Sequence, residues 1–296
     1  MRKEFASAVI QAKNVHANAV FITGDLGYMA FEEVIAHYGK HFVNAGVAEQ
    51  NMVTVAAGLA HEGFIPIVYS IAPFVTLRPY EQLRNDVCLH NLPVKVIGNG
   101  GGYGYGIMGA THHNLEDIGA LRMLPNMKVL VPLVADDVAQ AVAQMMQDAS
   151  PHYLRLNYQA KFDFDVAPFA EWRHIKQGEE ATVIGTGPVL QNMIKAFGNL
   201  DYWCVSMFPV TTVPDGLVES INRTGKIIYI EEHRGEGGLR ETLSFHLIDK
   251  LQLPVKVLSL AAAGYPSGRY GSQQWHQQEN SLGGENMLQA VNSFLK

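Results

Sequence analysis

One carboxylate lies where a predicted strand gives way to a predicted helix. Glu49 belongs to the segment Asn44–Asn51, which follows a short apolar strand and opens an apolar helix. Ligands of open parallel sheets bind where strands end and helices begin, so Glu49 would lie at such an edge. A carboxylate in a first helical turn also complements the helix dipole, which is worth about 0.3–1 kcal/mol. Spacing alone therefore leaves a binding role and a structural role open.

A glycine-rich stretch followed by two histidines is the second candidate. Seven glycines lie in the twelve residues from Gly98 to Gly109, and His112 and His113 follow shortly after. Glycine lets the backbone approach a ligand closely, and imidazoles can transfer protons or bind hydroxyl groups. The stretch lacks the G-x-x-x-x-G-K-[ST] pattern, and its G-x-G-x-x-G matches have no clearly placed acidic residue about 20 positions later. A surface loop with solvated histidines is an equal alternative.

Two further turns carry acidic residues. Asp25 follows the first predicted strand, where it could contact a ligand or stabilise the turn. Glu231, Glu232 and His233 lie between a strand and a helix in the second half of the chain. Their spacing fits no standard metal site. We therefore predict a structural or interface loop there, and no metal ligands in this chain.

Alternating strands and helices must position these residues. Compact apolar runs such as Ala19–Thr23 are typical of buried parallel strands. In the first half we expect strands at residues 19–23, 42–43, 65–69, 94–98, 129–131 and 153–156, and helices at 48–61, 76–90, 115–124 and 136–148. In the second half we expect strands at 181–185, 202–206, 226–231 and 255–258, and helices at 188–197, 238–249 and 284–295. This alternation predicts an α/β fold of two domains, each a mainly parallel sheet flanked by helices.

The alternation is interrupted once. Residues 159–179 show no sustained helix or strand period, so we predict an ordered linker there. The predicted domains therefore cover residues 1–158 and 180–296.

Composition excludes several classes of protein. The chain has 296 residues, of which 48% are hydrophobic, so it can bury one or two cores and intrinsic disorder is excluded. The formal net charge of −6 disfavours nucleic acid as a partner. No apolar run approaches the roughly 18–20 residues that span a bilayer. The two cysteines, Cys88 and Cys204, form no disulfide or metal pattern. We expect a cytoplasmic protein that binds neither nucleic acid nor membrane.

The chain resembles the transketolase and 1-deoxyxylulose-5-phosphate synthase family of thiamine-diphosphate enzymes. Five segments carry the resemblance, in the order of the family: Asn44–Met52, Ala72–Gln82, Gly109–His113, Leu124–Met127 and Glu231–Gly238. The resemblance covers essentially this whole chain but only the back half of a full transketolase. It implies a pyrimidine-binding domain followed by a transketolase C-terminal domain.

The front half of the family carries the Gly-Asp-Gly motif and a downstream Asn that hold Mg²⁺ and the diphosphate. This chain has no Gly-Asp-Gly, and the nearest sequence is Gly24-Asp25-Leu26. The resemblance therefore implies a split transketolase that transfers a two-carbon ketol unit from a ketose to an aldose. Thiamine diphosphate would be shared with a separate N-terminal-half subunit that supplies the Mg²⁺ ligands, in an α2β2 heterotetramer.

The resemblance also implies roles for individual residues. Glu49 would hydrogen-bond N1′ of the aminopyrimidine, and Phe74 would stack on that ring. Asp25 and Arg78 would also contact the cofactor. The catalytic residues would be Glu49 and His112, and His112 would bind substrate oxygens and shuttle protons.

Substrate binding would involve Thr111, His112, His113, Arg155 and Tyr158. The chain departs from the family pattern at four positions: Ile107-Met108 replaces an acidic pair, Tyr158 replaces an arginine that grips phosphate, and Met29 replaces a polar residue. Without the bidentate grip of that arginine, we expect the sugar to differ from a standard phosphorylated pentose, or its phosphate to be held differently.

Three other functions are compatible with the sequence. Two are enzymatic, a synthase of the 1-deoxyxylulose-5-phosphate type and the β subunit of a 2-oxoacid dehydrogenase. The third is a nucleotide-binding scaffold protein that uses the glycine-rich loop without catalysis.

Overall fold

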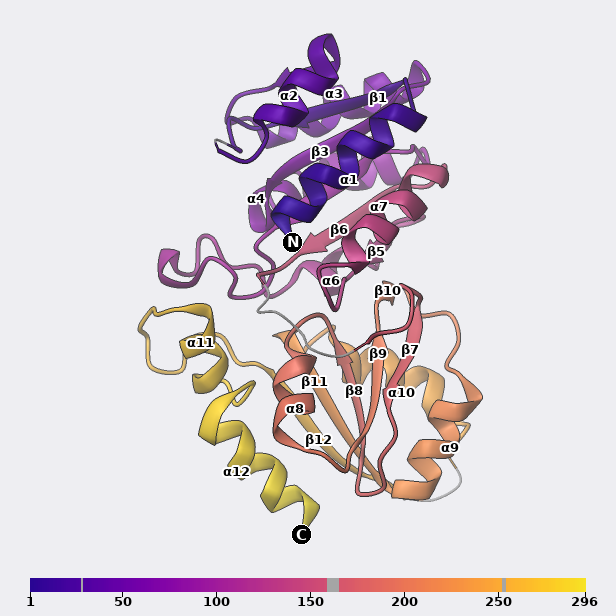
Figure 1. The fold of residues 1–296 in the computed structure, drawn as a ribbon, viewed down its shortest axis with the longest axis vertical. Coiled ribbons are helices and arrows are strands. Elements are labelled where there is room, and N and C mark those ends of the chain that lie inside the picture. The colour runs from indigo at the N-terminus through magenta and orange to yellow at the C-terminus, as the bar shows by residue number, and fades with distance from the viewer. Residues whose placement is uncertain (28, 159–164, 252–253) are drawn as a thin grey trace.

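The computed structural model describes residues 1–296 except 28, 159–164 and 252–253, and it places two sheets one above the other (Figure 1). Both sheets are sandwiched between helices, and the described part of the chain contains no helix long and apolar enough to cross a membrane. The predicted α/β class with two mainly parallel sheets is confirmed.

The first sheet has seven strands in the order β10-β5-β6-β4-β3-β1-β2. The strands from the first half of the chain are β1 (Ala19–Thr23), β2 (Phe42–Asn44), β3 (Ile65–Ile71), β4 (Lys95–Asn99), β5 (Lys128–Leu130) and β6 (His152–Leu156). These six pair in parallel. Strand β10 (Met207–Phe208) comes from the second half of the chain and adds to β5 in antiparallel orientation.

Helices cover both faces of this sheet. They are α1 (Arg2–Val15), α2 (Glu32–Tyr38), α3 (Glu49–His61), α4 (Ala72–Thr76), α5 (Tyr80–Gln82), α6 (Asp117–Leu121) and α7 (Asp137–Gln147), with short turns η1 (Gly39–His41), η2 (Leu83–Cys88) and η3 (Gly106–Met108). Alternate side chains of β1 point to opposite faces. Phe21 packs in the cluster that includes α1 and α7, whereas Val20 and Ile22 pack in the cluster that includes α3.

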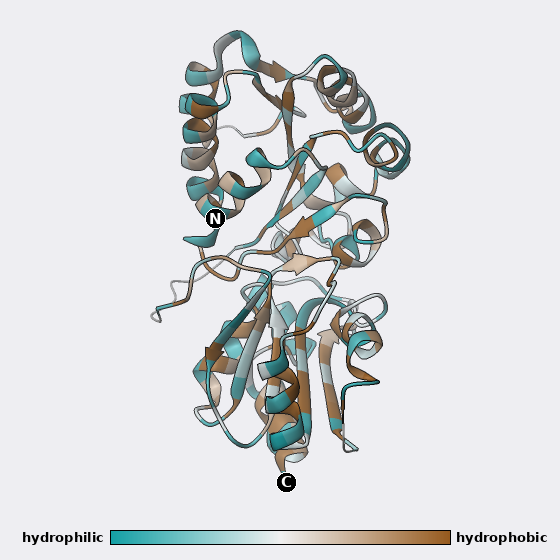
Figure 2. Ribbon diagram, turned by 90° about the vertical axis from the view of Figure 1, so that its right-hand side faces the viewer, coloured by the Kyte–Doolittle hydropathy of each residue, from teal (hydrophilic) through white to brown (hydrophobic). Residues whose placement is uncertain are grey.

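The second sheet has the order β12-β11-β8-β9-β7. Its strands are β7 (Trp172–Lys176), β8 (Thr182–Thr186), β9 (Asp201–Val205), β11 (Lys226–Arg234) and β12 (Lys256–Ala262), and only β7 is antiparallel to its neighbour within this described sheet. Its helices are α8 (Leu190–Ala196), α9 (Asp215–Thr224), α10 (Leu239–Leu247), α11 (Gln273–Glu279) and α12 (Gly284–Leu295). Figure 2 shows hydrophobic and hydrophilic stretches alternating along helices of both halves, as expected for helices with one face on a sheet.

Two local predictions were wrong. The helix expected over 76–90 is instead a series of short helices starting at residue 72, because Pro79 lies inside that run and removes a backbone donor. The linker expected over 159–179 contains β7, an edge strand in which only Arg173 is fully buried. Residues 159–164 of that linker lie outside the described residues.

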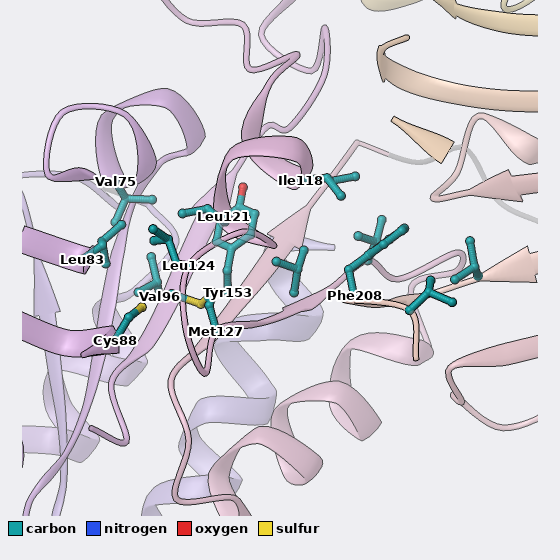
Figure 3. Packing of buried hydrophobic residues seen from close by; sticks show 14 of the residues in the cluster. Val75, Leu83, Cys88, Val96, Ile118, Leu121, Leu124, Met127, Tyr153 and Phe208 are labelled. Atoms are coloured by element: carbon teal, nitrogen blue, oxygen red, sulfur yellow. The ribbon is translucent and has the colours of Figure 1, made fainter. Parts of the chain in front are cut away.

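The two halves of the chain share one hydrophobic core. Figure 3 shows this cluster running from Val75 and Leu83 of the first sheet's helices, past Tyr153, to Phe208 of β10. A buried ion pair also joins the halves, because Arg173 of β7 donates to both carboxylate oxygens of Asp137 at 2.7 Å. The carboxyl edge of the first sheet therefore faces the second half of the chain with a fixed geometry.

Candidate functional site

Glu49 is the first residue of α3 and lies almost fully inside the protein, with 4% of its surface exposed. Its Oε2 accepts a hydrogen bond from Nη1 of Arg78 at 3.0 Å, and its Oε1 accepts one from Oγ of Ser70 at 3.4 Å. Ser70, near the end of β3, was not predicted as a site residue. The structure thus holds a buried carboxylate at the carboxyl edge of the sheet, at the start of a helix.

A flat aromatic surface stands beside this carboxylate. Phe74 of α4 is half-buried, and Cζ of the Arg78 guanidinium lies 3.8 Å from the centre of its ring. Arg78 therefore bridges the face of Phe74 and the carboxylate of Glu49. Glu49 and Arg78 border a surface pocket of about 400 Å³, which Val47, Gln50 and other residues around the start of α3 also line.

The glycine-rich loop brings His112 to the same place. The His112 ring is half-buried and meets the Phe74 ring edge-on, with centroids 5.2 Å apart. Nδ1 of His112 shares a hydrogen bond of 2.9 Å with Oγ1 of the exposed Thr111. The structure therefore brings four predicted site residues together, Glu49, Phe74, Arg78 and His112, with Thr111 at the rim.

His113 does not belong to this open site. It is buried, its Nε2 lies 2.7 Å from the carbonyl oxygen of Gly106, and its Nδ1 lies 2.9 Å from the hydroxyl of Tyr265. Burial lowers the pKa of His113 to about 4, so the ring is neutral at pH 7. The prediction of a substrate-binding role for His113 is corrected, because both ring nitrogens are used to fasten the loop.

Arg155 is also corrected. It lies in β6 with 1% of its surface exposed, and its Nε donates to Oδ2 of Asp117 at 2.8 Å. Its Nη2 donates to the carbonyl oxygens of Glu232 at 2.9 Å and Asn114 at 3.1 Å. A guanidinium held by these internal acceptors cross-links the two halves of the chain and does not face a substrate.

Glu232 lies near the end of β11, so part of the segment predicted as a structural or interface loop is a strand. The backbone N–H of Tyr103 donates to its Oε1 at 2.6 Å, and the side-chain amides of Gln273 and Gln277 donate to its carboxylate at 2.5–3.1 Å. A Cβ at Gly102, where φ is +64°, would lie only 2.5 Å from Oε1 of Glu232. The predicted interface loop therefore clamps the start of the glycine-rich loop.

The segment Glu231–His233 forms no metal site among the described residues. Burial raises the pKa of the Glu231 carboxyl to about 8, and that carboxyl accepts the backbone N–H of Leu239 at 2.8 Å. His233 accepts the backbone N–H of Gly119 at 3.1 Å. These contacts join α6 and α10 to the end of β11, which is a structural role.

The remaining predicted residues are exposed. Asp25 has a positive φ of 58°, which is uncommon outside glycine, and Asn44 holds it with two reciprocal hydrogen bonds of 2.9 and 3.1 Å. Tyr158, just after β6, is 71% exposed, and Ile107 and Met108 of η3 are exposed as well. A buried carboxylate, an aromatic face and an open imidazole can together bind a flat nitrogen heterocycle next to a polar substrate.

Comparisons with known proteins agree with this geometry. The family model described as the transketolase pyrimidine-binding domain matches residues 1–161, and the model of the transketolase C-terminal domain matches residues 170–279. The chain is 28% identical over 272 residues to one subunit of the apulose-4-phosphate transketolase of Phocaeicola vulgatus, an alignment that covers 88% of this chain and 86% of that protein. It is 31% identical over 276 residues to 1-deoxy-D-xylulose-5-phosphate synthase 1 of Geobacter metallireducens, but spans only 43% of that protein.

Solved structures agree with the sequence relatives. A structure titled a split gene transketolase, inactive beta4 tetramer, superposes with a TM-score of 0.84 at 25% identity, covering 99% of this chain and 97% of that one. Transketolase from Leishmania mexicana superposes with a TM-score of 0.78 at 15% identity over 99% of this chain and 45% of that one, which shows a shared fold.

Proposed function

This chain belongs to the transketolase family, and from that premise we propose that it is one subunit of a split, thiamine-diphosphate-dependent transketolase. The enzyme would transfer a two-carbon ketol unit from a ketose donor to an aldose acceptor. The chain would supply the pyrimidine half of the cofactor site, and a separate subunit would supply the diphosphate half.

The pairing of Glu49 with Phe74 carries this proposal. A flat, cationic nitrogen group already fits between them, because the Arg78 guanidinium stacks on Phe74 at 3.8 Å and donates to Glu49 at 3.0 Å. An aminopyrimidine makes the same two interactions, because its ring can stack on an aromatic face and its ring nitrogen can hydrogen-bond to a carboxylate. The residues present therefore fit the pyrimidine end of thiamine diphosphate. When bound, this cofactor supplies the electron sink for breaking and forming carbon–carbon bonds next to a carbonyl.

Each residue then has a defined task in the proposed enzyme. Glu49 shares a proton with the ring nitrogen, and its burial keeps water from competing for that hydrogen bond. Phe74 fixes the plane of the ring. His112 meets Phe74 edge-on, and its Nε2 makes no hydrogen bond to the described residues, so it is suited to hold a substrate oxygen and move a proton, while Thr111 orients its Nδ1. Asp25 contacts the cofactor from the rim.

The partner requirement rests on the similarity to a split transketolase, of whose solved chain 97% is covered. Within the described residues there is no group of three or more His, Cys, Asp or Glu side chains that could hold a metal ion. A diphosphate with Mg²⁺ needs hard oxygen ligands, so we assign these to the second subunit. The chain spans 86% of the apulose-4-phosphate transketolase subunit but only 43% of the synthase, which favours a split enzyme. An α2β2 heterotetramer is the corresponding closed assembly.

The proposal also concerns which sugars the enzyme accepts. Tyr158, Ile107 and Met108 are exposed at positions where the family pattern has charged side chains, and Arg155 is engaged in the interior. We therefore expect poor turnover of xylulose 5-phosphate with ribose 5-phosphate. Ordinary efficiency with that pair would contradict this expectation.

Three alternative functions make different predictions. A synthase of the deoxyxylulose type would use pyruvate as donor and release CO₂, as would a 2-oxoacid dehydrogenase subunit, whereas a transketolase would release an aldose. A nucleotide-binding scaffold would bind its ligand without a partner and would not depend on Glu49. Profiling ketoses against pyruvate separates these functions.

Titration calorimetry tests the proposal directly. Thiamine diphosphate with Mg²⁺ is titrated into this chain, into a candidate N-terminal-half subunit from the same organism, and into their mixture. We expect binding with one site per chain pair in the mixture only. Tight binding by this chain alone would refute the division of the site between two subunits.

A further inference from the structure

Arg78 fills the space that a stacked pyrimidine needs. Its guanidinium carbon lies 3.8 Å over the Phe74 ring, which is stacking distance, while its Nη1 is 3.0 Å from Oε2 of Glu49. A ligand that stacks on Phe74 and bonds to Glu49 at the same time must lie between these two residues. The guanidinium and such a ligand therefore exclude each other.

The guanidinium also resembles the ligand chemically. It is planar, carries N–H donors in that plane and stacks on aromatic faces. It gives the Glu49 carboxylate, which is only 4% exposed, a charged partner when no ligand is present. The Arg78 side chain itself is 47% exposed, so it can turn outward into solvent without passing through the core.

We propose that Arg78 is a placeholder: its guanidinium occupies the space between Phe74 and Glu49, here called the pyrimidine seat, until the cofactor displaces it. Arg78 therefore lowers the affinity for the cofactor. This inference rests on the proposed function. It departs from the expectation that Arg78 binds the cofactor, and the two roles predict opposite effects of removing the guanidinium. A placeholder weakens the apparent affinity by the fraction of molecules in which the seat is free.

The test compares four forms of this chain, each mixed with its partner subunit: wild type, Arg78→Met, Arg78→Lys and Arg84→Met. Methionine keeps length and apolar bulk but cannot stack as a cation or donate to Glu49. Lysine keeps the charge and loses the planar stack. Arg84 is the matched control, because it lies on the neighbouring η2, is exposed and donates its side-chain hydrogen bond to the adjacent Asn85.

Titration calorimetry with thiamine diphosphate and Mg²⁺ gives the first readout. We expect Arg78→Met to bind about 5- to 30-fold more tightly than wild type, from the usual strengths of a cation–π contact and a partly exposed ion pair. Arg78→Lys should be intermediate, and Arg84→Met unchanged. Weaker or unchanged binding by Arg78→Met overturns the placeholder. No binding by the wild-type mixture refutes the proposed function, and the placeholder with it.

A second readout needs no enzyme activity. In an arginine-selective ¹⁵N NMR spectrum of the cofactor-free protein, the side-chain proton on Nε of Arg78 should show a ring-current shift that disappears in Phe74→Leu. Adding cofactor to the mixture should move this signal to its solvent-exposed position. A signal that stays shifted after the cofactor has bound would show that Arg78 remains on Phe74, and would contradict the proposal.

Discussion

Replacing Glu49 by Gln removes one negative charge from the interior and leaves the shape of the side chain almost unchanged. In the wild-type protein the carboxylate is 4% exposed and accepts hydrogen bonds from Arg78 and Ser70. The amide can still occupy this space, but it cannot share a proton with a ring nitrogen as a carboxylate does. The substitution therefore separates the proposed chemistry from packing.

The expected loss of activity follows from that proton. General acid–base groups contribute about 10²- to 10⁴-fold to a rate, or about 2.7–5.4 kcal/mol at 1.36 kcal/mol for each factor of ten. The effect on folding should be small, because Arg78 is 47% exposed and can turn to water when its partner loses its charge. A partly exposed ion pair is worth no more than about 1 kcal/mol.

The assay is ketol transfer by the reconstituted enzyme under saturating cofactor, with thermal unfolding of the isolated chain measured in parallel. Glu62→Gln is the matched control, because Glu62 is exposed just after the other end of α3. We expect a fall in kcat of at least 10²-fold for Glu49→Gln, none for Glu62→Gln, and similar unfolding temperatures for both. Activity within about threefold of wild type in Glu49→Gln would refute the assigned role.

Three further predictions concern the elements that support the site. Arg155→Met should lower the free energy of unfolding by about 3–5 kcal/mol, because it leaves Asp117 buried without its partner; a raised KM with unchanged stability would instead restore the substrate role. His113 has a pKa lowered to about 4 by burial, so the folded protein binds fewer protons than the unfolded chain between about pH 6.5 and 4, and wild type loses stability as the pH falls through this window. His113→Phe should lose about 1–2 kcal/mol less than wild type between pH 7 and 5 in denaturant titrations, and an identical pH dependence would show that the ring is not held neutral. Gly102→Ala puts a Cβ against Glu232 at a positive φ, so kcat should fall more than about 10-fold while cofactor affinity stays unchanged; wild-type kcat would show that the clamp does not position the loop.

The sequence predicts the parts of this molecule that depend on local pattern. The apolar run of β1 and the amphipathic face of α3 lie where their periods place them. Glu49 and His112 are linked through Arg78 and Phe74 at one edge of the sheet, because parallel strands carry the loops after their carboxyl ends to the same edge. The polar edge strand β7 escaped prediction, because it buries only Arg173 fully and shows no apolar alternation.

The parts that failed depend on contacts distant in the sequence. Arg155 and His113 look like surface site residues from their neighbours alone. Their burial comes from Glu232 and Tyr265, which are 77 and 152 positions away. Only the packing of the second half of the chain onto the first shows that these two side chains are buried and hold the two halves together through hydrogen bonds.

The most direct test of the central claim is a structure of the reconstituted complex with thiamine diphosphate and Mg²⁺. We predict that the aminopyrimidine lies between Phe74 and Glu49, with its N1′ within hydrogen-bonding distance of the Glu49 carboxylate and the metal held by the partner. A cofactor bound elsewhere, with Glu49 still paired to Arg78, would contradict the claim that this chain supplies the pyrimidine half of the site.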